Sequence, residues 1–124
     1  MTVSAFWAAV RAQLRRPEGT AGSFAGHTMR LANARINSAA VRALDPRSGE
    51  RIVEIGCGPG EALHCILARD VASVTGIDHS AVMIRQAARR NGRALAAGRL
   101  RLVHGDFLRL PVESASVDAV LAVN

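Results

Sequence analysis

Apolar residues change their spacing along the chain near residue 46. Before that point they recur every three or four positions, which is the period of an amphipathic helix. After residue 50 they form short runs rich in valine and isoleucine, separated by stretches with helical spacing. This alternation predicts an α/β fold with a parallel sheet covered by helices. The predicted strands are 51–55, 71–77, 99–104 and 117–123, and the predicted helices between them are 60–70 and 80–91. Ser80 is predicted to cap the second of these helices and Asn91-Gly92 to end it.

The region before the first strand is predicted to be helical. A first helix carries its apolar residues on one face, namely Val3, Phe6, Trp7, Val10 and Leu14. We interpret it as a helix packed on the domain, with a membrane-surface anchor as the alternative. The small, glycine-rich residues 17–27 predict a loop. A second helix is predicted at 28–44, with an apolar stripe of Met29, Ala32, Ile36, Ala40 and Ala43.

A glycine-rich turn follows the first predicted strand. Residues 53–61 read Val-Glu-Ile-Gly-Cys-Gly-Pro-Gly-Glu, and eighteen residues after Gly60 the second apolar run ends in Asp78. Glycine lacks a Cβ atom, so the backbone can adopt positive φ and a ligand can approach the main chain closely. A strand, such a turn, a helix and a second strand ending in an acid are the parts of a nucleoside-binding βαβ unit.

The acids beside this turn favour a cationic ligand over a dinucleotide. A dinucleotide fingerprint would place its third glycine at position 61, where this chain has Glu61 at the start of a predicted helix. A carboxylate there repels a pyrophosphate by roughly 2–3 kcal/mol at ~6 Å and an effective dielectric constant of ~20. Glu54 adds a second negative charge in this interpretation.

Four segments in order resemble the motifs of class I S-adenosylmethionine (SAM) dependent methyltransferases. They are 54–60, with the pattern acid-x-G-x-G-x-G, then 76–83, 105–107 and 117–124. The resemblance is to the small-molecule branch that includes ubiquinone and menaquinone biosynthesis enzymes (methyltransferase type 11). It implies a Rossmann-like parallel sheet and transfer of a methyl group from SAM to a small-molecule or lipid-like acceptor.

The resemblance also implies which residues hold the cofactor. Asp78 would bind the ribose hydroxyls, Met83 would pack near the adenine, Asp106 would accept from the adenine amino group and Phe107 would lie beside the ring. Asn124 would border the methionine end. The remaining implied cofactor-binding residues are Glu54, Gly56, Cys57, Gly58, Gly60 and His79. No catalytic residue and no metal site is assigned. In similar enzymes a segment before the first strand closes over the cofactor, so we expect residues 1–45 to form an N-terminal helical segment or lid and 46–124 to form the SAM-binding half-domain.

The last predicted strand ends the chain. Relatives of this kind have a sheet of order 3-2-1-4-5-7-6, so we expect a chain truncated after strand 4, with a partial sheet of order 3-2-1-4. The strand at 117–123 would then be an apolar edge strand, which favours edge-to-edge self-association. Two alternatives stay open: a catalytically incomplete SAM-binding fragment or assembly module, and, less favoured because of Glu61 and Gly105-Asp106, an NAD-dependent oxidoreductase.

Composition narrows the expected partners and location. The formal net charge of +6 comes from arginine alone, and the arginines are scattered. With no tyrosine and one tryptophan, the chain lacks the aromatic residues that accompany nucleic-acid binding, so no nucleic-acid partner is expected. Cys57 and Cys65 show neither disulfide nor metal-site spacing, which favours a cytoplasmic location. No apolar run approaches ~20 residues, so membrane insertion is not expected.

Overall fold

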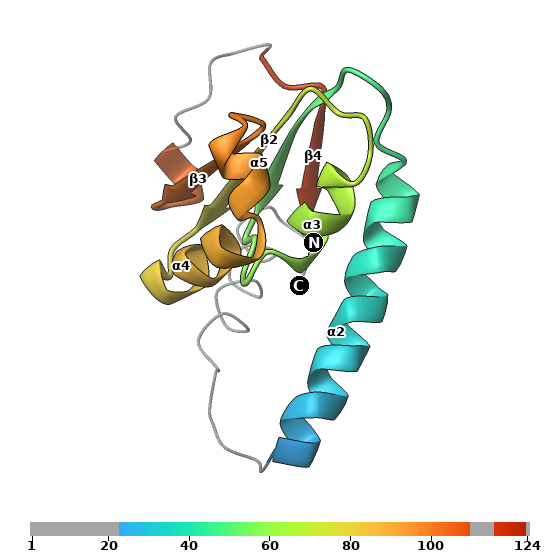
Figure 1. The fold of residues 1–124 in the computed structure, drawn as a ribbon, viewed down its shortest axis with the longest axis vertical. Helices are drawn as coiled ribbons and strands as arrows, with labels where there is room; N and C mark the ends of the chain where they lie inside the picture. The colour runs from blue at the N-terminus through green and yellow to red at the C-terminus, as the bar shows by residue number, and fades with distance from the viewer. Residues whose placement is uncertain (1–22, 110–115, 124) are drawn as a thin grey trace. The chain divides into compact units, whose positions relative to one another are not determined.

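Four parallel strands form the sheet of this protein. The computed structural model describes residues 23–109 and 116–123. Its strands are β1 (Arg51–Ile55), β2 (Ser73–Asp78), β3 (Leu100–His104) and β4 (Ala119–Ala122), in the order β3-β2-β1-β4 (Figure 1). The predicted fold class and the order 3-2-1-4 are therefore confirmed. The register places Glu54 of β1 between Gly76 of β2 and Leu121 of β4.

The helices α2 (Ser23–Leu44), α3 (Glu61–Leu67) and α4 (Ala81–Arg90) contribute to a core on one face of the sheet. Alternate residues of a strand point to the same face, so one set of buried strand side chains meets these helices, whereas Val53 and Ile77, which are also buried, point to the other face. The core residues are Ile52, Val74, Leu100 and Leu121 from the strands and Val41, Leu63, Ile66 and Ala87 from the helices. Two short elements complete the described fold, α5 (Gly92–Ala96) and the 3-10 helix η1 (Phe107–Arg109).

Helix α2 differs from its prediction at its start and in its buried face. It begins at Ser23, so the predicted loop is wrong for residues 23–27, whereas residues 17–22 and the first predicted helix lie outside the described residues. Val41 is buried, while Ile36 of the predicted apolar stripe is 50% exposed. Alanines surround this helix on several sides, so its apolar pattern defines a direction only weakly. The half-buried Asn37 instead donates to Glu61 Oε2 of α3 over 3.4 Å.

The other predicted elements are confirmed with shifted ends. Helix α3 ends at Leu67 rather than 70, and β4 begins at Ala119 rather than 117. Asn91-Gly92 ends α4 as predicted, but α5 begins at once, which the sequence did not indicate. Ser80 caps α4 as predicted, because its Oγ accepts from the backbone N–H of Met83 over 3.3 Å.

An exposed ion pair fastens β4 to β1 at their amino ends. Asp118 accepts from the backbone N–H of Arg51 over 2.7 Å and from its guanidinium Nε over 3.2 Å. These hydrogen bonds from Arg51 lower the pKa of Asp118. Asp118 therefore links the two strands directly before β4 begins at Ala119.

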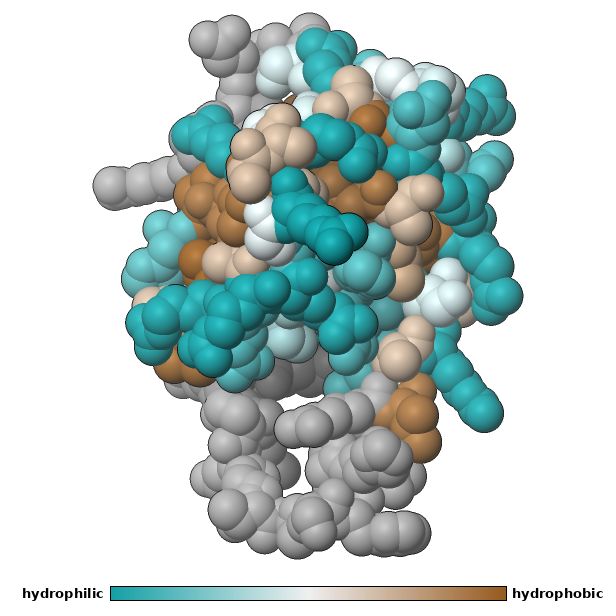
Figure 2. All heavy atoms as spheres, viewed as in Figure 1, coloured by the Kyte–Doolittle hydropathy of each residue, from teal (hydrophilic) through white to brown (hydrophobic). Residues whose placement is uncertain are grey.

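The surface over α4 is hydrophilic (Figure 2). Arg85, Arg89 and Arg90 are all exposed, so this arginine group is a solvated helix face. None of the helices within residues 23–109 and 116–123 is long and apolar enough to cross a membrane.

Candidate functional site

The turn after β1 is a glycine loop anchored on β2. The backbone N–H groups of Gly56 and Cys57 both donate to the carbonyl oxygen of Ile77, over 2.8 and 3.0 Å. Gly56 and Gly58 have φ values of 70° and 53°, and no described atom lies within 4 Å of a Cβ added at either. The loop backbone at these two glycines is therefore open to a ligand that must approach the main chain closely.

Gly60 has a different environment from the other two loop glycines. A Cβ at Gly60 would lie 2.7 Å from Asn91 Nδ2 and 3.0 Å from the Cβ of Ala87. The same Asn91 amide donates to the carbonyl of Gly60 over 3.1 Å and to that of Ala87 over 3.1 Å. Gly60 is thus placed against α4, where it permits close packing of the loop. Sequence reasoning assigned no role to Asn91 beyond a helix stop.

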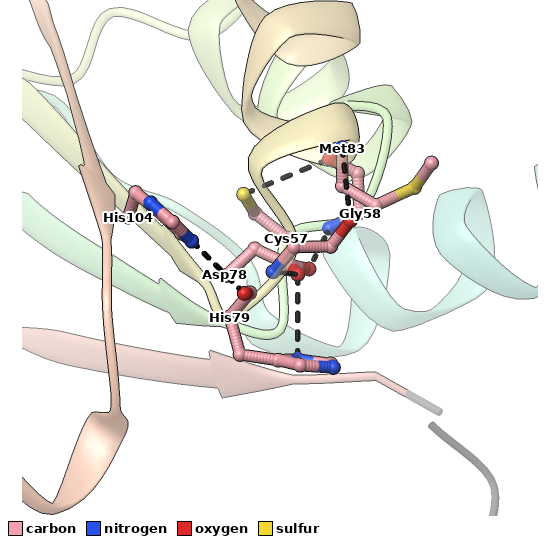
Figure 3. Close-up of polar contacts among 7 residues, drawn as sticks. Cys57, Gly58, Asp78, His79, Met83 and His104 are labelled. Atoms are coloured by element: carbon pink, nitrogen blue, oxygen red, sulfur yellow. Dashed lines mark hydrogen bonds and ion pairs between the residues drawn. The ribbon is translucent and has the colours of Figure 1, made fainter. Parts of the chain in front are cut away.

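Asp78 at the end of β2 joins the glycine loop to the start of α4 (Figure 3). Its Oδ2 accepts from the backbone N–H of Gly58 over 2.9 Å, and its Oδ1 accepts from that of Ser80 over 2.8 Å. The residue is 4% exposed. Each carboxylate oxygen can accept more than one hydrogen bond, so Asp78 retains acceptor capacity for a further donor.

Glu54 is buried close to this acid, at 2% exposure. Burial, and to a lesser extent the negative charge of Asp78, raise its pKa to about 8. No hydrogen-bond partner for its Oε2 exists among the described residues. The sequence interpretation of Glu54 as a second fixed negative charge is therefore corrected: at neutral pH its carboxyl is mainly protonated in the ligand-free structure.

Cys57 lies in the loop between these two acids and is buried. Burial, together with the charges of Glu54 and Asp78, raises the pKa of its thiol to about 12. Its Sγ donates to the carbonyl of Gly58 over 3.8 Å. The thiol is consequently neutral and poorly nucleophilic, so it contributes packing and not covalent chemistry.

The ends of β2 and β3 bring further predicted residues to the same edge of the sheet. The backbone N–H of Gly105 donates to the carbonyl of Asp78 over 3.0 Å. His104 Nε2 lies 3.0 Å from the carbonyl oxygen of His79, and because a carbonyl only accepts, this nitrogen carries a proton. His79 Nδ1 lies 3.5 Å from Asp78 Oδ1 (Figure 3).

The remaining predicted residues lie nearby or outside the described part. Asp106 is exposed and its Oδ1 accepts from the backbone N–H of Leu108 over 3.0 Å, which shapes the turn that carries Phe107. Met83 is half-buried in the first turn of α4 (Figure 3). Asn124 lies outside the described residues. The structure thus gathers the loop, Asp78 and the segment after β3 at the carboxyl ends of the strands, where open α/β sheets bind ligands.

Comparison with known families matches this arrangement. Residues 52–124, more than half of the chain, match the family described as methyltransferase domain. The chain belongs to this family. The match begins at β1 and includes the glycine loop, Asp78 and the segment after β3.

Several proteins are similar to this methyltransferase-domain chain. It is 32% identical over 101 residues to the uncharacterized methyltransferase YdaC of Bacillus subtilis, covering 81% of this chain and 54% of YdaC. It is 35% identical over 97 residues to the 27-O-demethylrifamycin SV methyltransferase of Amycolatopsis mediterranei, covering 77% of this chain and 35% of that protein. The chain therefore spans between about a third and a half of these relatives.

A solved structure agrees with the sequence matches. The SAM-dependent methyltransferase of Thiobacillus denitrificans, crystallised with S-adenosyl-L-homocysteine, is 30% identical. The similarity has a TM-score of 0.58 and covers 72% of this chain and 36% of that one.

Proposed function

We propose that this chain is the cofactor-binding part of a SAM-dependent methyltransferase that acts on a small-molecule or lipid-like acceptor. The observation that carries the proposal is the Asp78 carboxylate, which accepts from Gly58 and Ser80 beside two glycines that have no described atom in front of them. An acid with spare acceptor capacity suits a ribose diol, and an open glycine backbone suits a ligand laid across the loop.

We further propose the following roles. Gly56 and Gly58 admit the ligand to the main chain, Cys57 packs behind it, and Gly60 keeps the loop against α4. Asp78 holds hydroxyl groups, with His79 beside it at the rim. Met83, Asp106 and Phe107 border the adenine base. Glu54 interacts with the cationic methionine end of SAM.

When bound, SAM supplies a methyl group activated on a sulfonium sulfur. The chain's own contribution is to bind and orient that cofactor, because methyl transfer depends chiefly on placing donor and acceptor in line and in contact. None of the described residues is assigned as a general base.

The acceptor class is supported by the names of the relatives. One is a methyltransferase of 27-O-demethylrifamycin SV and another is a 24-methylenesterol C-methyltransferase of rice, 30% identical over 80 residues. These names favour a small or lipid-like molecule over a macromolecule. The free thiols of Cys57 and Cys65 support a reducing, cytoplasmic location.

Calorimetric titration with SAM, S-adenosylhomocysteine and NAD tests the function. We expect SAM and its product to bind and NAD to show no binding. Asp78→Ala should weaken SAM binding by about 1–3 kcal/mol, because it removes acceptors for the ligand hydroxyls and for the loop N–H groups. Asp78→Asn should also weaken SAM binding, because it keeps one acceptor oxygen but turns an NH2 group toward the N–H of Gly58 or Ser80.

The matched control is Asp70→Ala. Asp70 is an exposed acid that accepts from Ser48 Oγ over 2.8 Å at the amino end of β2, away from the loop. Its removal should leave SAM affinity unchanged. NAD binding without SAM binding, or wild-type SAM affinity in Asp78→Ala, would contradict the assignment.

We also propose that the isolated chain associates with a second copy through β4. In the described sheet this strand pairs with β1 on one side only, and its Val120 is 57% exposed. An apolar strand with unpaired backbone groups on one edge is a template for another strand.

A further inference from the structure

Glu54 is the one buried side chain of the candidate site with an unsatisfied polar atom among the described residues. It lies two residues before Gly56, at the end of β1, and its Oε2 has no hydrogen-bond partner there. Buried polar groups are normally hydrogen-bonded, and an ionised carboxyl without a partner is especially costly. An unpartnered acid beside an open ligand loop therefore requires an explanation.

Among the described residues, the surroundings of Glu54 contain negative charge and no compensating cation. The strands on either side present Gly76 and Leu121 opposite it, neither of which titrates. Its pKa is raised by burial and then by Asp78, and no positively charged group acts on it. Cys57, the other titratable neighbour, is a neutral thiol. The helices packed on this face carry further titratable or charged residues that do not contribute to the shift: Arg35 and Arg42 of α2, Glu61, His64 and Cys65 of α3, and Arg85, Arg89 and Arg90 of α4.

A carboxyl in such a place stays neutral until a positive charge arrives. A cation next to a carboxyl favours its ionised form, which offsets both the burial and the repulsion by Asp78. SAM carries two positive groups at its methionine end, the sulfonium and the ammonium. The same end of SAM has one carboxylate, so its net charge is +1. The product keeps the ammonium and the carboxylate but loses the sulfonium charge, and adenosine has none of these groups.

We propose that Glu54 senses the charge of the cofactor: its carboxyl is protonated in the empty site and releases that proton to solvent when the cationic end of SAM binds. This inference rests on the proposed SAM-binding function. Binding then exchanges one proton for one cation, so the net charge of the buried site does not change. Glu54 thereby selects a cationic ligand.

Proton release makes the affinity depend on pH. Below the pKa of Glu54, each unit of rising pH should strengthen SAM binding up to tenfold, and the gain should level off above about pH 8. Adenosine should bind with the same affinity across this range, because it brings no cation to the acid.

Calorimetric titration of the 124-residue chain in buffers of different protonation enthalpy counts the protons released. At pH 6 and 7 we expect close to one proton per SAM bound and none per adenosine. Glu54→Gln should lose the release and flatten the pH dependence. Glu61→Gln is the matched control, because it makes the same change at a half-exposed acid, the first residue of α3, and should retain the release.

The product identifies which cation is sensed. Release with S-adenosylhomocysteine assigns the ammonium, and release with SAM alone assigns the sulfonium. Both results support proton exchange at Glu54.

Two outcomes separate this inference from the function on which it rests. SAM binding with no proton released, or with equal release by wild type and Glu54→Gln, would overturn the inference and leave the function intact. Absence of SAM binding at every pH would overturn the function. If Glu54→Gln does not fold, carbon-13 NMR of the Glu54 carboxyl in the wild-type chain tests the same point. On addition of SAM its chemical shift should change from that of a protonated carboxyl to that of an ionised one.

Discussion

Gly56, Gly58 and Gly60 all have positive φ values, of 70°, 53° and 90°. The conformation explains why each is glycine, because L side chains rarely adopt it. Their surroundings differ, since the first two have open space beside them and Gly60 faces Asn91 and Ala87. The pattern of glycines in the sequence predicts the shared conformation, whereas the packing of Gly60 depends on a helix thirty residues further along the chain.

Gly60→Ala should destabilise the protein by about 2–5 kcal/mol. About 1–2 kcal/mol of this comes from the left-handed backbone conformation. The remainder comes from pushing Asn91 and the backbone of Ala87 away from the new methyl group. Gly49→Ala is the control, because Gly49 has φ of 77° but nothing within 4 Å of an added Cβ. Urea unfolding should show the larger loss for Gly60→Ala, and equal losses would mean that the contact with α4 contributes nothing.

The protonation of Glu54 shows what a sequence pattern leaves out. The acid-x-G-x-G-x-G pattern predicts a carboxyl in front of the loop, and the structure places it there. Its charge depends on 2% exposure and on the proximity of Asp78, which comes from a strand more than twenty residues away. The burial of Glu54 depends on segments distant in the sequence, so the local pattern alone assigned it the wrong charge.

At the scale of elements, the sequence predicts the sheet well and the helices less well. Buried parallel strands are nearly continuous apolar runs, so β1, β2, β3 and β4 could be recognised, and the Ser80 cap fixed the start of α4. The buried face of α2 could not be predicted, because it consists of Val41 with Ala40 and Leu44, while further alanines lie on other sides of the helix. Arg99 likewise gave no signal, although its guanidinium donates to the carbonyls of Leu67, Arg69 and Val71.

The edge of β4 that pairs with no described strand leads to a prediction about association. Val120→Lys places a charge on the edge strand and should keep the chain monomeric, whereas the wild-type mass measured by light scattering should rise with concentration. Val82→Lys makes the same change on α4, where Val82 is 49% exposed, and should associate like wild type. A wild-type monomer at every concentration would rule out pairing through β4.

At the scale of the whole molecule, Glu54 links folding stability to pH. The unfolded chain has a glutamate pKa near 4.5, and the folded chain raises the pKa of Glu54 to about 8. Between these values the folded state holds a proton that the unfolded state has lost. The stabilisation is therefore fully present below pH 4.5 and is lost as the pH rises through 8.

We expect the free energy of unfolding of the ligand-free chain to fall from pH 5 to pH 8, with a contribution from Glu54 of up to about 1.4 kcal/mol per pH unit. Urea unfolding at one-unit intervals measures it. In Glu54→Gln this contribution should disappear, and in Glu61→Gln it should persist. Parallel pH profiles for wild type and Glu54→Gln would show that the acid is ionised in the folded state.

The contact of Gly60 with Asn91 and Ala87 restricts how this protein can change over evolutionary time. A side chain at position 60 meets both residues and also has to adopt a φ of 90°, so smaller residues at 91 or 87 remove only the first of two obstacles. Loss of Asn91 in turn removes the amide that holds the carbonyl of Gly60. The three positions are therefore expected to diverge as a group, in an order set by the space between the loop and α4.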